Sequence, residues 1–504
     1  DLPAMRSPCL PALFTLIAAS AALYLAVPIR ADEPQPPSGP PGLPPQQTPT
    51  RTTPLSSSQT SATPVNGPAP GPAAAGFTGF VRPAWLTDLS FGIKESYDDN
   101  VLRVSGLGLP TEGSWVDVLS LKLGVDLAPW LAAPGPIQTF ALIYQPDRVV
   151  YSQAASESFT VHRLNTVLKG KTGDLSFSLD NAFLYNDGNK LAETYALNQL
   201  SGAGADQDDK YRNSLAHAAP RERRNQIQDR YTAFLQWDTP HLFIRPISQF
   251  NDIDLRTDLF NTSKAPYLGY QDYVGRYDIN AGADLGFKVA PGWALTVGYR
   301  DGYQHQDQFA QAINSDRHFS SNHYQRLLFG VEARLSWLNL RLVGGPDFRD
   351  FNPQTPIDHL RTTRFFGEAS ATATLAPGHS LIVAYRDYIF TSSTGLIPYE
   401  EYTYSLTYRW AVSKQLGLEV GGKHFEHNYT IGNDTAGSGP SLRLDYDDEG
   451  LATVSYAVTA HLGSSLSYSY DVGRNGLGSL PAKYAPSYRD FNEGVLSFGL
   501  QYKF

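Results

Sequence analysis

From Phe77 onward, apolar and polar residues alternate in short stretches, so that every second side chain is apolar. An alternation with period two is typical of a β-strand that has one apolar and one polar face. The range 277–289 shows it most clearly: Tyr, Ile, Ala, Ala, Leu, Phe and Val occupy the odd positions, and Asp, Asn, Gly, Asp, Gly and Lys lie between them. The ranges 119–127 and 402–410 follow the same pattern. The sequence therefore predicts an all-β fold.

Eighteen such segments follow one another along the chain, with two kinds of connection between them. Short turns, such as Thr239-Pro240 and Ser336-Trp337, alternate with long polar connections, of which 187–225 is the longest. Barrels of the bacterial outer membrane have short periplasmic turns and longer extracellular loops, whereas a soluble sandwich has no reason to gather its short turns at one end. The segments begin near Trp85, Trp115, Ile137, Phe159, Leu175, Gln226, His241, Tyr273, Ala294, Tyr324, Leu338, Thr362, Leu381, Glu400, Leu416, Leu442, Ser464 and Ser487.

This arrangement predicts a transmembrane antiparallel β-barrel of about 18 strands over residues 80–504. Nine long loops and eight short turns would place both chain ends in the periplasm. Outer-membrane lipid is then the expected surrounding of the barrel. Barrels of 16–18 strands leave an aqueous channel, so a lumen is expected as well.

The N-terminal part has a different composition. Residues 1–31 contain Arg6 and a 15-residue apolar run, Leu13–Val27, which predicts a cleaved signal peptide; an uncleaved membrane anchor is the alternative. Residues 32–79 are rich in Pro, Ser and Thr, a composition that predicts a disordered periplasmic segment. This segment is a plain spacer or docks a periplasmic or cell-wall partner.

Composition excludes several other classes of protein. The chain has one cysteine, Cys9, which lies in the expected signal peptide, so a disulfide framework, a zinc-thiolate site and a cysteine nucleophile are not expected. No cofactor is predicted. A net charge of -9 argues against a nucleic-acid partner. Beyond the N-terminus, no apolar run reaches the roughly 20 residues of a spanning helix.

Tryptophan positions support the barrel, because indole rings favour the membrane interface and barrels carry aromatic girdles there. Six of the seven tryptophans map to the short-turn end, a bias that ordinary strand capping does not predict. The predicted girdle consists of Trp85, Trp130, Trp237, Trp293, Trp337 and Trp410.

Charged residues on the polar faces are the candidates for the lining of the pore. Among them arginines outnumber acids, which predicts a mild preference for anionic or polyhydroxylated solutes; charges that are merely paired in a wet lumen are the alternative. The candidates are Lys122, Arg230, Arg276, Arg300, Arg326, Arg334, Arg341, Arg364, Arg386, Arg409, Glu332 and Glu368.

Enzyme motifs are largely absent. His424 and His427 are residues of a type that binds metals. Residues three apart on a strand point to opposite faces, however, so no metal site is predicted. No catalytic residue is assigned. A surface hydrolase stays open as a third function, because Ser, Asp and His from neighbouring strands can meet without a sequence signature.

The C-terminal segment 496–504 has one apolar face that ends on an aromatic residue. It resembles the C-terminal assembly signal of bacterial outer-membrane barrels, with Ser497, Gly499, Tyr502 and Phe504 at the signal positions. The resemblance covers eight residues. It implies recognition by the outer-membrane barrel assembly machinery.

A second resemblance lies near the start of the barrel. The range 89–101, which includes Tyr97-Asp98-Asp99-Asn100, resembles the opening strand and turn of the β-barrel porins of type 2. The resemblance implies an outer-membrane channel through which small hydrophilic solutes diffuse. Members of that family often accompany exopolysaccharide systems, so a barrel for polysaccharide export or a surface scaffold is the alternative. Substrate, ion selectivity, oligomeric state and a plugging role of 187–225 are left open by the sequence.

Overall fold

The computed structural model describes residues 83, 85–101, 113–131, 135–188, 225–256, 275–307, 321–352, 360–391, 398–428, 444–475 and 491–504. The expected signal peptide and proline-rich segment lie outside these ranges. Within them, no helix is long and apolar enough to cross a membrane. The elements are β1 (Leu86–Asp98), β2 (Ser114–Asp126), η1 (Ala128–Trp130), β3 (Ile137–Tyr151), η2 (Ala155–Glu157), β4 (Phe159–Thr172), β5 (Leu175–Asn186), β6 (Gln226–Asp238), β7 (Leu242–Leu255), β8 (Arg276–Ala290), β9 (Trp293–Gln306), β10 (Asn322–Arg334), β11 (Leu338–Phe351), β12 (Arg361–Ala376), β13 (His379–Phe390), β14 (Tyr399–Ala411), β15 (Leu416–Asn428), β16 (Leu444–Ala457), β17 (Leu462–Asn475) and β18 (Phe491–Lys503).

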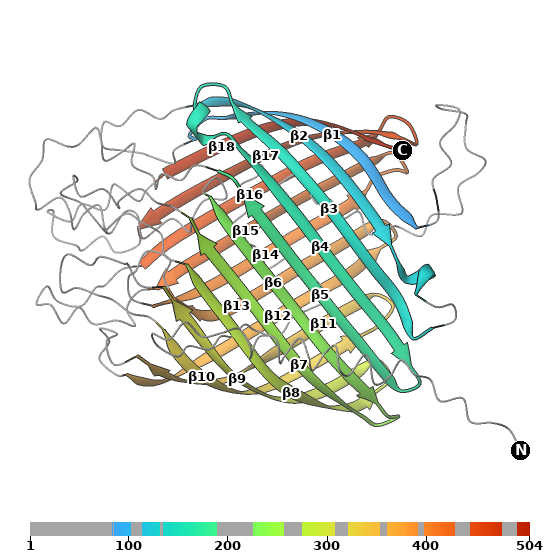
Figure 1. The fold of residues 1–504 in the computed structure, drawn as a ribbon, viewed down its shortest axis with the longest axis vertical. Coiled ribbons are helices and arrows are strands. Elements are labelled where there is room, and N and C mark those ends of the chain that lie inside the picture. Colours follow the sequence, from blue (N-terminus) through green and yellow to red (C-terminus); the bar gives the residue numbers. More distant parts are fainter. Residues whose placement is uncertain are drawn as a thin grey trace, which may run out of the picture. The chain divides into compact units, whose positions relative to one another are not determined.

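The eighteen strands form one closed antiparallel sheet (Figure 1). Each strand pairs with the next one in sequence, and β1 also pairs with β18, which leaves no free edge. The prediction of an antiparallel barrel of 18 strands is confirmed. Every predicted strand start falls within four residues of the observed one.

Connections at the two ends of the barrel differ in length, as the sequence predicted. The strand bounds leave eight connections at the end where β1 begins, here called the turn end, and nine at the other, the loop end. Three turn-end connections have two residues, and Gly173, Gly292 and Gly378 adopt positive φ in them. Tight hairpin turns require this backbone conformation, which glycine tolerates.

One connection departs from the expected pattern of lengths. Residues 127–136 at the turn end include η1 and are longer than 152–158 at the loop end. The Asp126 carboxylate accepts the backbone N–H groups of Ala128 at 3.0 Å and Phe140 at 3.1 Å, so it holds this wide turn together. Turn-end connections are therefore short in most places but not in all.

Side chains on the two faces of the wall differ in character. On β17 and β18, Leu466, Tyr468 and Phe498 are about half exposed on the outer face. Ser467 and Ser497 form a register pair that points inward, and Ser497 is buried. Exposed apolar side chains recur on the outer face of the other strands. An apolar belt around a closed sheet is the surface that lipid chains cover in a transmembrane barrel.

The inner face is not polar throughout. Near the loop ends of β2, β3 and β4, Val116, Val149, Tyr151, Phe159 and Val161 pack into a buried apolar cluster. The connection 152–158 is short enough for Ala154 to join this cluster. The sequence predicts a wetted inner face here, but these apolar side chains pack against one another across neighbouring strands and are buried.

Closure of the barrel depends on the seam between β1 and β18. Nine register pairs join the two strands, from Ser90 with Lys503 to Asp98 with Val495. The Ser96 hydroxyl donates a hydrogen bond to the Ser497 hydroxyl at 2.8 Å, and the Phe504 N–H donates to the Leu89 carbonyl at 3.0 Å. The conspicuous C-terminal segment is therefore the strand that closes the sheet.

We expect an arginine on the outer face to destabilise the barrel far more than one on the inner face. Leu466→Arg places a charge against lipid chains and should lower the free energy of unfolding by about 2–4 kcal/mol. Ser467→Arg, its matched control, points inward and should cost much less. Urea unfolding in lipid vesicles measures both, and equal losses would contradict the assignment of the two faces.

Candidate functional site

The interior of the barrel carries the charged residues that could act on a solute. On β9, Leu295, Val297 and Tyr299 are exposed on the outer face, whereas Arg300 and Gln304 on the other face are fully buried. The same alternation along neighbouring strands brings side chains from several strands together inside the barrel.

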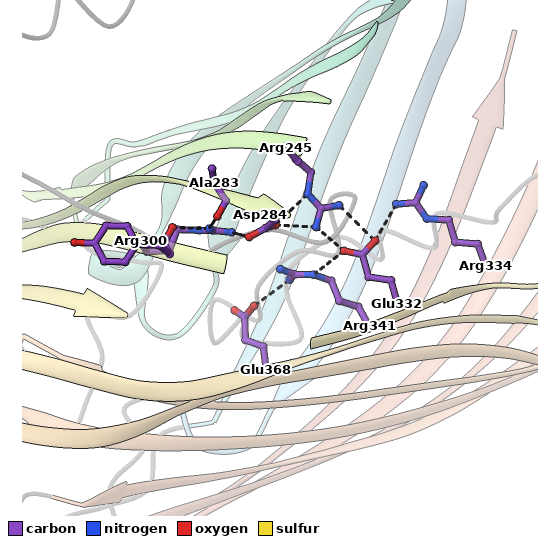
Figure 2. A network of polar contacts seen from close by, with 9 residues as sticks. Arg245, Ala283, Asp284, Arg300, Glu332, Arg334, Arg341 and Glu368 are labelled. Carbon is purple, nitrogen blue, oxygen red and sulfur yellow. Dashed lines mark hydrogen bonds and ion pairs between the residues drawn. The ribbon is translucent and has the colours of Figure 1, made fainter. Parts of the chain in front are cut away.

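Six residues from consecutive strands β7 to β12 form a continuous chain of opposite charges (Figure 2). We call it the central arginine network. It consists of Arg245, Asp284, Arg300, Glu332, Arg341 and Glu368.

Arg245 is the centre of this network. Its Nη2 atom lies 2.8 Å from Asp284 Oδ2 and 2.5 Å from Glu332 Oε1, so one guanidinium joins carboxylates of β8 and β10. Arg300 approaches the other oxygen of Asp284 at 2.6 Å. Charge-assisted bonds of this kind fix both partners in one geometry.

Arg341 extends the network toward β12. It lies 3.9 Å from Glu332 and 3.4 Å from Glu368, and its side chain is mostly buried. Each carboxylate of the network thus has a guanidinium partner, which offsets the cost of removing both charges from water.

The twelve candidate pore residues all lie on the inner face by strand register. Most of them are engaged: Lys122 pairs with Asp88 at 2.7 Å, Arg386 with Glu401 at 2.9 Å and Arg409 with Glu419 at 2.6 Å. The central arginine network includes Arg300, Glu332, Arg341 and Glu368, and Arg334 approaches Glu332 at 3.5 Å. Arg276 donates to the Thr391 carbonyl, and Arg326 lies 3.2 Å from Asp347.

Arg364 differs from these engaged arginines. Its side chain is exposed on the inner face of β12, at a position paired in register with Asp347. Within the described ranges, the Arg364 and Arg230 side chains make no hydrogen bond or ion pair. Arg364 is therefore a solvent-exposed cation that could interact with a solute.

Sequence reasoning missed several charged groups of the interior. Arg245 was not among the candidates, because β7 carries apolar residues on both faces, such as Phe243 and Ile244, and so gives no clear alternation. Arg349 on β11 was missed as well. Further inward acids also escaped notice. They are Asp147, Asp347, Glu401, Asp447, Asp471 and Glu493. These acids offset much of the positive charge that the candidate list implied.

Exposure of the inner face changes along the barrel axis. Toward the turn end, the side chains of Lys122 and Arg409 are 34% exposed and that of Arg334 is 69% exposed. In the loop half, Arg326 is fully buried and Asp471 is 3% exposed. These charged side chains are more exposed toward the turn end, with Arg364 near the loop end of β12 as an exception.

The tryptophans of the predicted girdle lie at the turn end. Trp237 and Trp410 are the second-last residues of β6 and β14, and Trp293 begins β9. Trp85 and Trp130 are 5.6 Å apart between ring centroids, and Trp337 is exposed in the turn before β11. Trp115, the seventh tryptophan, lies near the loop end of β2.

Several histidines of the described ranges have side-chain partners. His424 points outward and lies 2.7 Å from Asp448, whereas His427 points inward and lies 3.2 Å from Glu401. The two rings lie on opposite faces, as the strand period predicted. Within the described part of the chain, no group of three metal-ligating side chains converges.

Ser321, His305 and Asp307 lie in the order of a nucleophile, a base and an acid. The Ser321 Oγ is 3.4 Å from His305 Nδ1, and His305 Nε2 is 3.0 Å from Asp307. Ser321 is only 3% exposed, however, and its oxygen accepts the Gln306 N–H at 3.0 Å. We interpret this group as a cap on the loop end of the β9–β10 hairpin.

The closed sheet, its apolar outer belt and its charged interior define the class of protein. The chain is a transmembrane β-barrel of the kind found in bacterial outer membranes. The fold implied by the resemblance to β-barrel porins is thus confirmed. No protein-family model matches the sequence, and no curated protein matches it either.

Comparison with solved structures returns other barrels. OccK2 of Pseudomonas aeruginosa, crystallised with glucuronate, is 12% identical, with a TM-score of 0.38 over 83% of this chain and 98% of the other. OmpT of Vibrio cholerae, solved as a loop-deletion mutant, is 10% identical, with a TM-score of 0.32 over 83% of this chain and 98% of the other. The siderophore receptor PirA of Acinetobacter baumannii is 8% identical, with a TM-score of 0.38 over 83% of this chain and 81% of the other. Similarity at this level supports no statement about substrate or function.

Removal of the central guanidinium should destabilise the barrel. Arg245→Met leaves Asp284 and Glu332 buried with their shared partner lost, so we expect the free energy of unfolding to fall by about 3 kcal/mol. Arg334→Met removes an exposed partner of Glu332 and should change it by less than about 0.5 kcal/mol. Urea unfolding in vesicles gives both values; similar losses would show that the network is not the stabilising element.

Proposed function

We propose that this protein is an outer-membrane channel for the passive diffusion of small hydrophilic solutes. One observation carries the proposal: the closed sheet of 18 strands has an apolar outer face and a charged inner face. Barrels with this number of strands are wide enough to hold water. Charged side chains on the inner face favour solutes that carry charge or many hydroxyl groups.

Ten of the twelve inward candidates are proposed to line the pore; Arg300 and Arg326 are fully buried and are left out. Arg364 is the one we expect to act most strongly on ions. Its side chain is exposed and makes no hydrogen bond or ion pair in the described ranges, so no partner there neutralises its charge. The inward acids of β14 to β18 oppose it, so we expect only weak anion selectivity.

Orientation and partners complete the proposal. The short connections face the periplasm, so the start of β1 and the end of β18 do so too, and the six tryptophans form the aromatic girdle of the periplasmic leaflet. Ser497, Gly499, Tyr502 and Phe504 serve as the assembly signal, supported by the place of β18 as the closing strand. Residues 32–79 are proposed to span the periplasm or dock a partner there. Catalysis forms no part of the proposal.

Purified full-length protein in planar lipid bilayers tests the channel. We expect stepwise ionic conductance, and swelling of liposomes that contain the protein when small sugars are added outside. A folded, inserted barrel that passes neither ions nor sugars would overturn the proposal.

A charge reversal tests the role of Arg364. Arg364→Glu should shift the reversal potential in a salt gradient toward cation selectivity, because an exposed inward charge biases the ions that enter. Arg361→Glu is the matched control, since Arg361 lies on the same strand but on the outer face, paired with Asp350 at 3.2 Å. Equal shifts for both variants would exclude Arg364 as a lining residue.

A further inference from the structure

Side chains from strands far apart in the sheet meet inside the loop half of the barrel. Tyr388 on β13 donates a hydrogen bond to Asp278 on β8, five strands away. Gln304 on β9 donates to the Tyr388 hydroxyl and to the Ile389 carbonyl, each at 2.8 Å. Four to five strand spacings measure roughly 19–24 Å along the wall. Because these short contacts bridge that length, the wall must bend sharply between β8 and β13.

A second set of contacts joins the same strands nearer their ends. Arg276 on β8 donates to the carbonyl of Thr391, which directly follows β13. Its guanidinium lies 5.4 Å from the centroid of the Phe390 ring. The approach of β8 to β13 is therefore not limited to one pair of side chains.

Behind this bridge, aromatic rings enclose the guanidinium of Arg326. The ring centroids of Tyr324, Phe366 and Tyr388 lie 3.9, 4.3 and 4.8 Å from it. Arg326 is fully buried, and its charge is offset by Asp347 at 3.2 Å and by the faces of the rings.

Arg349 fills the space beside Arg326. It bonds to Gln304 at 2.8 Å and to Asn322 at 2.9 Å, and it lies 4.8 Å from the Tyr324 ring centroid. The result is a buried block of side chains in the part of the interior that β8 to β13 enclose. We call it the cross-lumen cluster; its members are Asp278, Gln304, Tyr324, Arg326, Arg349, Phe366 and Tyr388.

We propose that Tyr388 determines the size of solute that passes the channel, because its hydroxyl latches β13 to β8 and β9 and closes this part of the lumen. The inference rests on the proposed channel function. While these hydrogen bonds are made, the cross-lumen cluster fills the part of the lumen that β8 to β13 enclose, here called the lobe. Solutes must then pass through the rest of the cross-section. When the bonds break, the wall can relax outward and the lobe joins the channel.

Tyr388→Phe tests the latch with the least disturbance, since it keeps the ring against Arg326 and removes only the hydroxyl. Loss of the hydrogen bonds to Asp278 and Gln304 should raise the fraction of molecules in which β13 has moved away from β8 by roughly 5- to 30-fold. The measurements are the single-channel conductance and the largest sugar that swells proteoliposomes, and we expect both to increase. Tyr388→Ala also opens the aromatic cage and should increase both further.

Tyr385→Phe is the matched control. Tyr385 lies on the same strand, three residues away, and points outward against Tyr404 with ring centroids 5.1 Å apart. It should leave conductance and size limit unchanged. Heat-modifiable migration on a gel shows whether each variant is folded.

A reversible cross-link provides the converse test. In a Cys9→Ser background, Asp278→Cys and Tyr388→Cys are joined by a bifunctional thiol reagent that contains a disulfide. The cross-link should lower the conductance of the double variant, and dithiothreitol should restore it. Folded Tyr388 variants with wild-type conductance and size limit, in a protein that does conduct, would overturn the latch. Absence of conductance in the wild type would instead overturn the channel itself.

Discussion

Backbone hydrogen bonding in hydrocarbon is the constraint on which this structure depends. Inside a membrane no water is available to hydrogen-bond the N–H and C=O groups of a strand, so a sheet there must have no free edge. The pairing of β1 with β18 meets this requirement, through nine register pairs and the bond between Ser96 and Ser497. Once the sheet is closed, each strand has one face toward lipid and one toward the interior, and the role of every side chain follows from its face.

The interior owes its character to side chains rather than to the backbone. In the central arginine network, guanidinium and carboxylate groups alternate across six strands, so that each buried charge is neutralised by a neighbour. In the loop half, the cross-lumen cluster and the apolar cluster around Tyr151 fill space that an idealised 18-stranded barrel would leave to water. The effective width of the channel is therefore set by packing and by local bending of the wall, not by strand number alone.

Charge and exposure are distributed unevenly over the inner face. Basic side chains are concentrated on β6 to β13, and buried acids such as Asp447, Asp471 and Glu493 lie on β16 to β18. Exposed charges are more frequent toward the turn end. A solute that enters from that end first meets exposed charged side chains and then, in the loop half, the buried cross-lumen cluster together with the exposed Arg364. The proposed channel would present these environments to a solute in that order.

The sequence by itself determined the number of strands, their approximate bounds, which face of most strands is apolar and the end at which the tryptophans lie. These features are encoded locally, because a strand has a period of two and a turn is marked by a few residues. Tertiary structure alone decided that Arg245 joins two carboxylates, that apolar residues of β2 to β4 close part of the interior, and that Tyr388 reaches Asp278, 110 positions earlier in the chain. Contacts of this kind depend on the curvature of the closed sheet, and no local pattern records that curvature.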